Sequence, residues 1–118
     1  MSYVDGYVLA VPTKNKERYI QLAEEAAVVF KDYGALAVVE NWADDVPEGK
    51  ITSLPMSVKC EEGEEVVFSW IVWPSREARD SGNQAAMEDS RLKAWDLKQM
   101  PFDSKRMIFG GFKTIVNY

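Results

Sequence analysis

The stretch EVVFSWIVW, residues 65–73, is followed directly by Pro74 and decides the fold of this chain. It is apolar at almost every position, which is typical of a strand that is buried on both faces of a sheet. Pro74 ends the strand because proline has no backbone N–H to donate to a neighbouring strand. We therefore expect residues 65–73 to lie in the interior of a β-sheet.

A strand, a helix and a second strand precede this central strand. Residues 3–12 alternate between a face of large and polar side chains and a face of small apolar ones, which predicts a strand that ends at Pro12. Asn15 is a suitable N-cap for the helix that follows, whose apolar residues recur every three or four positions as far as Tyr33. Residues 35–43 then form the second predicted strand.

An arm, residues 44–63, separates the second strand from the central one. Its first part reads as a loop, and residues 61–63 read as a turn. Residues 54–60 contain Pro55 and are expected to be extended, because proline is tolerated in an edge strand. We expect this arm to leave the body of the monomer and to pair at a sheet edge or wrap around a partner subunit.

A second helix and a last strand follow the central strand. Ser75 caps a helix that is expected to end near residues 87–89, and residues 91–98 are expected to form a short helix. Residues 106–116 form the last predicted strand. The glycine pair 110–111 inside it predicts either a bulge or a close approach of other groups to the backbone.

The order of elements predicts the fold class. Strand, helix, strand, extra hairpin arm, strand, helix, strand is the α+β, split βαβ arrangement of ferredoxin-like folds, with both helices on one face of an antiparallel sheet. The opposite face needs a cover, which the same face of a second copy can provide about a two-fold axis. We therefore expect a single domain, residues 1–118, that assembles as a homodimeric α/β barrel.

Composition excludes several classes of function. The chain has no histidine, which excludes His-ligated haem, His-based zinc sites and triads that need an imidazole base. The formal net charge of −5 argues against binding to nucleic acids or anionic membranes. The single Cys60 forms no internal disulfide and suits a reducing cytoplasm. We expect a cytoplasmic protein with no metal site, cofactor, nucleic-acid partner or membrane partner.

Three motifs resemble, in the right order, the signatures of the YbaA-like bacterial proteins, a family of unknown function. They are ENWADDVPEGK (residues 40–50), FSWIVWPS (68–75) and MPFDSKRMIFGGF (100–112). One departure is Ala43, where the family carries glycine. The resemblance implies membership of the dimeric α/β-barrel superfamily, which includes cofactor-free monooxygenases, muconolactone isomerases, chlorite dismutases and dye peroxidases. It implies no particular reaction for this chain.

Glu40 and Tyr7 are the leading catalytic candidates. Both, together with Asp5, lie on strand faces that we expect to point into the barrel. A split βαβ sheet sets the first two strands side by side or one strand apart, so we expect Tyr7 to lie close to Glu40. An apolar barrel would raise the pKa of a carboxyl group and make it a general base. Glu40 or Asp5 would then be the base, Tyr7 the acid or hydrogen-bond donor, and Asp5 also a ligand-binding residue. The alternative is a structural ion pair with Arg79 or Arg106.

Three tryptophans and one arginine are the remaining ligand-binding candidates. Trp42 lies two residues from Glu40 and shares its face, whereas Trp70 and Trp73 point to opposite faces of their strand. They could form walls of an apolar pocket, or they could belong to the core and the dimer interface. Arg106 could bind a substrate carboxylate, and the alternative is a solvated turn.

These candidates support two functional hypotheses. The first is a protein that binds a small organic molecule in the barrel, with or without a cofactor-free monooxygenase-like or isomerase-like reaction. The second is a non-enzymatic homodimeric binding or scaffold protein. A cavity of a few hundred cubic ångströms with an inward carboxylate favours the first, and a sealed core favours the second. The sequence leaves open whether the chain is an enzyme.

Overall fold

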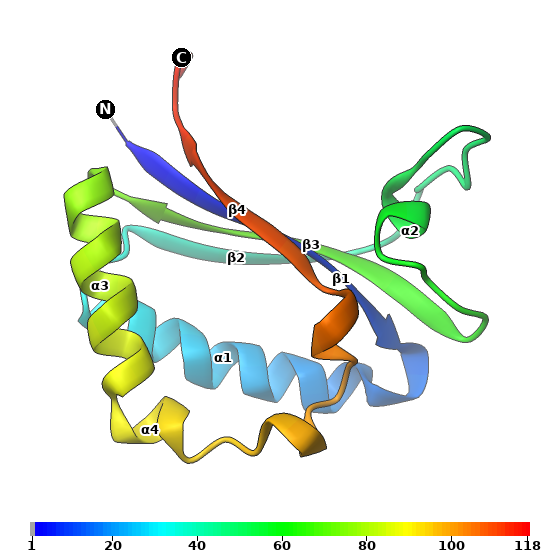
Figure 1. Cartoon of the computed structure of the whole chain (residues 1–118), viewed down its shortest axis with the longest axis horizontal. Coiled ribbons are helices and arrows are strands. Elements are labelled where there is room, and N and C mark those ends of the chain that lie inside the picture. Colours follow the sequence, from blue (N-terminus) through cyan, green and yellow to red (C-terminus); the bar gives the residue numbers. More distant parts are fainter. Residues whose placement is uncertain (1) are drawn as a thin grey trace.

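The computed structural model describes residues 2–118 and has the α+β architecture expected from the order of the elements (Figure 1). One antiparallel sheet has the strand order β2-β3-β1-β4. Its strands are β1 (Tyr3–Pro12), β2 (Ala37–Trp42), β3 (Glu64–Trp73) and β4 (Ile108–Lys113). The apolar strand predicted to be interior is β3, which pairs with β2 on one side and β1 on the other. This is the split βαβ topology of a ferredoxin-like fold.

The two long helices, α1 (Lys16–Asp32) and α3 (Arg76–Glu88), cover one face of the sheet (Figure 1). Ser75 caps α3 as predicted, because its hydroxyl accepts a hydrogen bond from a backbone N–H of the first turn. Asn15 precedes α1, but its side chain makes no capping hydrogen bond. Among residues 2–118, no helix combines the length and apolarity needed to cross a membrane.

An irregular segment connects α3 to β4, and we call residues 89–107 the strap. It contains α4 (Ser90–Lys93) and the 3₁₀ turns η2 (Leu97–Gln99) and η3 (Ser104–Arg106). The helix predicted over residues 91–98 is therefore interrupted after Lys93. Among residues 2–118, four side-chain polar contacts tie the strap to the helical layer. The Tyr33 hydroxyl donates to Asp89 (2.8 Å), the Asn15 amide donates to the Pro101 carbonyl (3.1 Å), Arg91 pairs with Asp32 (2.9 Å), and Arg18 donates to the Gln99 carbonyl.

Two aromatic contacts hold α1 against the rest of the molecule. Near its C-terminus, Phe30 lies edge-on against the fully buried Trp73 of β3, with ring centroids 6.3 Å apart. Near its N-terminus, Tyr19 lies edge-on against Phe102 of the strap at 5.8 Å. Such pairs add stability beyond the burial of their surface. These two pairs therefore hold both ends of α1 against the rest of the molecule.

The sheet face opposite α1 and α3, here called the far face, stays open in the single chain. The register places Val8 of β1 between Phe68 of β3 and Ile108 of β4 on this face. Phe68 is 43% exposed, and Phe112 is 62% exposed. The chain itself thus leaves apolar surface uncovered, as the order of elements predicted.

The arm corrects one prediction. Residues 54–60 are not an extended edge strand, because Leu54–Ser57 form a one-turn helix, α2, that is capped by the Ser53 hydroxyl. Proline is also well tolerated in the first turn of a helix, so Pro55 does not by itself indicate an edge strand. The arm folds back onto one end of the far face, where the buried Val58 packs with residues of β1 and β3.

The glycine pair in β4 forms no bulge, and one of its members, Gly111, marks a close approach of other side chains to the backbone. Pairing is continuous, with Gly110 opposite Gly6 and Gly111 opposite Asp5. A Cβ atom on Gly111 would lie 2.3 Å from an Nη atom of Arg79 and 2.5 Å from the hydroxyl of Tyr3. A larger residue at position 111 would therefore displace the Arg79 side chain.

Candidate functional site

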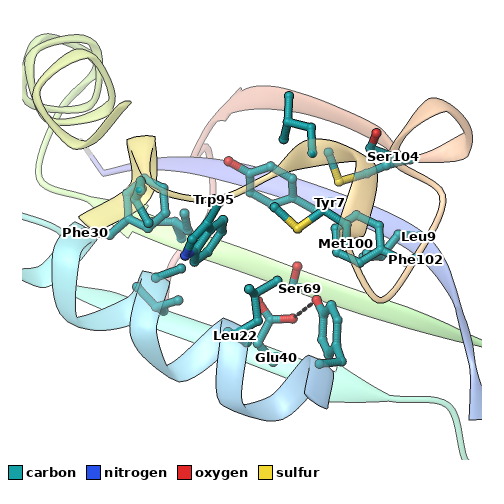
Figure 2. Close-up of a pocket in the computed structure, with 18 of the residues that line it drawn as sticks. Tyr7, Leu9, Leu22, Phe30, Glu40, Ser69, Trp95, Met100, Phe102 and Ser104 are labelled. Carbon is teal, nitrogen blue, oxygen red and sulfur yellow. Dashed lines mark hydrogen bonds between the residues drawn. The ribbon is translucent and has the colours of Figure 1, made fainter. Parts of the chain in front are cut away.

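A cavity of about 340 Å³ lies between the sheet and α1, with the strap across it (Figure 2). Small side chains on α1, Ala23 and Ala26, leave the space, and strands β1, β2 and β3 form the floor. Most of the wall is apolar. It consists of Leu9, Leu22, Ala23, Ala26, Phe30, Val38, Ile71, Met87, Leu92, Trp95, Leu97, Met100, Phe102 and Met107. This volume lies at the lower end of the range for small-molecule sites.

The polar groups of the floor stand in one row across three strands. Ser69 of β3 pairs with Glu40 of β2 on one side and with Tyr7 of β1 on the other. All three side chains line the cavity, so a carboxyl, a hydroxyl and a phenol face the same space (Figure 2). Phe109 of β4 continues the row and stacks on Tyr7, with ring centroids 6.1 Å apart.

Glu40 is held by one hydrogen bond, in which the Tyr19 hydroxyl donates to Oε1 at 2.5 Å (dashed in Figure 2). Within residues 2–118, no lysine or arginine lies within ion-pair distance of the Glu40 carboxyl. Desolvation raises the pKa of Glu40, and the hydrogen bond from Tyr19 opposes this rise. Glu40 is nevertheless an exposed residue that lines the cavity, so its carboxyl is accessible to a small molecule.

The two tyrosines around Glu40 are hydrogen-bond donors at neutral pH. Burial raises the pKa of Tyr7 to about 12, with a further contribution from the negative charge of Asp5. Burial and the neighbouring Glu40 carboxyl also raise the pKa of Tyr19. Neither phenol therefore ionises near pH 7, and each can donate a proton in a hydrogen bond to an oxygen.

The structure places Glu40, Tyr7 and Asp5 on the sheet face that α1 and α3 cover, whereas we expected them to point into a barrel between two sheets. The alternation of side chains along β1 showed that its two faces differ, and we expected the face with large residues to point into the barrel between two subunits. That face instead packs beneath the helices, because α1 needs large apolar partners such as Leu9 and Val11. The predicted closeness of Tyr7 and Glu40 is present, one strand apart in a common row.

Asp5 lies beneath α3 in a separate polar cluster and does not line the cavity. It is 5% exposed, and it accepts hydrogen bonds from Trp73 Nε1 (3.1 Å) and from the Asn83 amide (3.2 Å). Arg79 Nε lies 3.4 Å from its other carboxyl oxygen. The ion pair with Arg79 that we considered as an alternative thus exists, and it engages Asp5. These contacts give Asp5 and Trp73 a structural role.

The remaining candidates lie away from the cavity. Trp70 is on the far face, where it packs edge-on against Phe68. Trp42 lines a second cavity beside the first. Arg106 joins the strap to the base of the arm, because its guanidinium donates to both carboxyl oxygens of Glu64 at 2.8 Å and to the Lys59 carbonyl at 2.8 Å. This network occupies several of its donors, and Arg106 is not brought to the cavity.

Sequence reasoning missed several residues of the site. Ser69 was read as part of an apolar strand, and Tyr19 as part of the apolar stripe of α1. The register provides the missing signal for Ser69, since it lies opposite both Tyr7 and Glu40. Trp95 and Met100 reach the cavity from the strap, whose irregular backbone gives no periodic pattern to read. Among residues 2–118, no three acidic or cysteine side chains converge on a point that could hold a metal ion.

Comparison with known proteins connects this architecture to a family without assigning a reaction. The chain is 56% identical over 117 residues to a protein from Escherichia coli strain K12 described as "Uncharacterized protein YbaA", with 99% of each chain covered. The protein of that description from Shigella flexneri matches with the same identity and coverage. The family model described as "Protein of unknown function (DUF1428)" matches residues 2–104. The chain therefore belongs to the DUF1428 family.

Proposed function

We propose that this protein binds a small, largely apolar organic molecule in the first cavity and moves a proton with Glu40. The observation that carries the proposal is an apolar space of about 340 Å³ whose floor holds a carboxyl, a hydroxyl and a phenol in one row. At roughly 30 Å³ per water, this space equals about eleven water molecules. That volume suits a molecule with one or two rings.

The row of polar groups suggests how such a molecule is held and what is done to it. An aromatic or unsaturated ring would lie against the apolar wall and direct an oxygen substituent toward Tyr7. Glu40 would remove a proton from a carbon or hydroxyl of the ligand, and Tyr7 would stabilise the negative charge on the ligand oxygen. Return of the proton from Glu40 to a second ligand atom completes an isomerisation without any co-reactant. A monooxygenase-like reaction would share the first step and would need dioxygen as oxidant.

Tyr19 and Ser69 would orient the reacting groups. Tyr19 occupies Oε1 of Glu40, and within residues 2–118 no protein group donates to Oε2, which leaves this oxygen for the ligand. Ser69 stands between Glu40 and Tyr7 and can donate to or accept from the ligand. A desolvated carboxyl with one free oxygen and a raised pKa is a stronger general base than an ordinary carboxyl group.

Binding is tested with a library of small aromatic and unsaturated carbonyl compounds, monitored by thermal unfolding and by the NMR signal of the Trp95 indole. At a concentration of 100 times Kd, a ligand stabilises the protein by about 2.7 kcal/mol, or roughly 10 °C in Tm for a chain of this size. The Glu40→Gln variant should still bind the compounds that bind the unmodified protein, but it should not convert them. Failure of every compound to shift both Tm and the Trp95 signal would contradict the proposed function.

We further infer that two copies associate through the far face. The central part of this face has no charged side chain, so it is complementary to itself about a two-fold axis. Four strands of 6 to 10 residues make a sheet of roughly 500 Å² in plan. A standard interface takes about 800 Å² from each partner. The arm, residues 44–63, and the exposed apolar tail with Ile115 and Val116 would supply the difference.

A further inference from the structure

A second cavity of about 340 Å³ lies between α1 and the edge strand β2. It shares four lining residues with the first cavity, namely Tyr19, Ala23, Val38 and Glu40. The hydrogen bond between Tyr19 and Glu40 therefore lies in the wall that separates the two spaces. The rim of the second cavity is more polar than that of the first, since Lys16, Glu24 and Asn41 contribute to it.

One wall of this cavity already carries an ammonium group. The Nζ atom of Lys16 lies 5.1 Å from the centroid of the Trp42 ring, within the range of a cation–π contact. Lys16 is exposed at the start of α1, so its side chain can move into water at little cost. Its stem and ammonium group have the chemistry of a short alkylamine. The contact shows that the face of Trp42 accepts such a group.

The charges around the cavity favour a cation. The side chains of Glu24 and Glu40 both contribute to the lining, and within residues 2–118 neither forms an ion pair. With both carboxyls ionised, the lining carries a net charge of about −1 while Lys16 is present and about −2 once it moves away. The net charge of the whole chain, −5, also attracts cations to the surface.

We propose that the second cavity is a binding site for a small alkylammonium ion, with Lys16 as a tethered competitor. The ligand's ammonium group would take the place of the Lys16 ammonium on Trp42, near Glu24 and Glu40. Its alkyl chain would lie on the apolar part of the wall, which includes Ile20 and Ala27. This site adjoins the proton-transfer site of the first cavity and shares Glu40 with it, but it does not require that the proposed reaction take place.

An anionic ligand paired with Lys16 is the opposite possibility. It would bring a negative charge beside two carboxyl groups, and like charges at this range repel. It would also draw the Lys16 ammonium away from its favourable position on Trp42. The two possibilities predict opposite effects of removing Lys16, because Lys16 competes with a cation and attracts an anion.

The test uses the whole chain and three probes of matched size, n-butylammonium, n-butanol and butyrate. Tryptophan indole N–H signals are followed by ¹H–¹⁵N NMR at neutral pH. We expect n-butylammonium to shift the Trp42 signal with saturation and to leave the Trp95 signal of the first cavity unchanged. Butanol and butyrate should bind at least fivefold more weakly. Lys16→Ala, which keeps a good helix former at this position, should tighten butylammonium binding by roughly two- to fivefold.

Three further variants separate the two cavities. Glu24→Gln retains the shape of an exposed residue and should weaken butylammonium binding by roughly two- to fivefold. Ala27→Leu fills the second cavity and should abolish binding, whereas Ala26→Leu fills only the first cavity and should not affect it. Weaker binding in Lys16→Ala, stronger binding of butyrate than of butylammonium, or equal binding of butanol would each overturn the proposal. The expected result for Ala26→Leu is loss of binding to the first cavity with unchanged binding of butylammonium.

Discussion

Replacing Ala26 by leucine should stabilise the protein and close its first cavity. Ala26 lines the first cavity on α1 and is partly buried. Leucine adds three carbons, which contribute about 2.4 kcal/mol at full burial, at about 0.8 kcal/mol for each. The cavity is partly accessible to water, so about two-thirds of this value applies, and ordering the side chain costs roughly 0.5–1 kcal/mol. The net expectation is about 1 kcal/mol of added stability.

Urea unfolding measures this change directly. With an unchanged m-value of 1–2 kcal/mol/M, an added 1 kcal/mol raises the midpoint by about 0.5–1 M and Tm by roughly 3–5 °C. The same variant should lose every ligand of the first cavity. Val28→Leu is the matched control, because Val28 is 56% exposed on the same helix and its replacement should change stability by less than about 0.5 kcal/mol.

Two results would refute this reasoning. A loss of about 1–3 kcal/mol in Ala26→Leu is the effect of overpacking, and it would mean that the space is filled by side chains in solution. A stabilised variant that still binds first-cavity ligands would mean that those ligands lie elsewhere. Either result would remove the observation on which the proposed function rests.

Three further predictions test the site, the core and the assembly. Glu40→Gln should fold normally. The folded-state pKa of Glu40 is raised, so the unmodified protein should gain most stability over this variant below pH 4.5, the ordinary carboxyl pKa. This advantage should fall as the pH rises through the raised pKa. Urea unfolding at several pH values that shows the opposite slope would contradict the raised pKa. Gly82→Ala should lower the free energy of unfolding by about 2 kcal/mol in urea, because a Cβ at position 82 would lie 2.2 Å from the Trp73 ring. At an ordinary helix position the same replacement raises the free energy of unfolding. A rise at position 82 would show that Trp73 can move. Phe68→Glu should leave the single chain folded but reduce the mass measured by light scattering from twice 13.4 kDa to 13.4 kDa. If the unmodified protein is already a monomer at micromolar concentration, the far-face dimer is ruled out.

The strands and long helices could be predicted because their patterns depend on local chemistry. Pro12 and Pro74 each remove a backbone donor, so they fix the ends of β1 and β3 closely. The apolar run of β3 requires burial on both sides and hence a central place in the sheet. The prediction of an edge strand at residues 54–60 was wrong, because a single proline suits both an edge strand and the first turn of a helix.

The candidate site could be predicted only in part, because it depends on which sheet face the helices cover. Alternation predicted that Glu40 and Trp42 share a face, and the split βαβ topology predicted that Tyr7 lies near them, but neither says what covers that face. The bond between Tyr19 and Glu40 joins a helix to a strand, and its existence depends on how α1 is placed on the sheet. The strap has no periodic pattern, so its place across the cavity was not foreseen.

The cavity follows from where α1 carries small residues. At one end of the helix Phe30 contacts Trp73, and at the other Tyr19 contacts Phe102, so these aromatic pairs hold α1 at a fixed height above the sheet. Between them α1 presents Ala23, which is too short to reach the floor, and the space stays open. A larger side chain in this part of the helix would add stability, so a chain with a purely structural role gains nothing from leaving the space empty. The open space over a row of polar groups therefore favours a binding function over a scaffold.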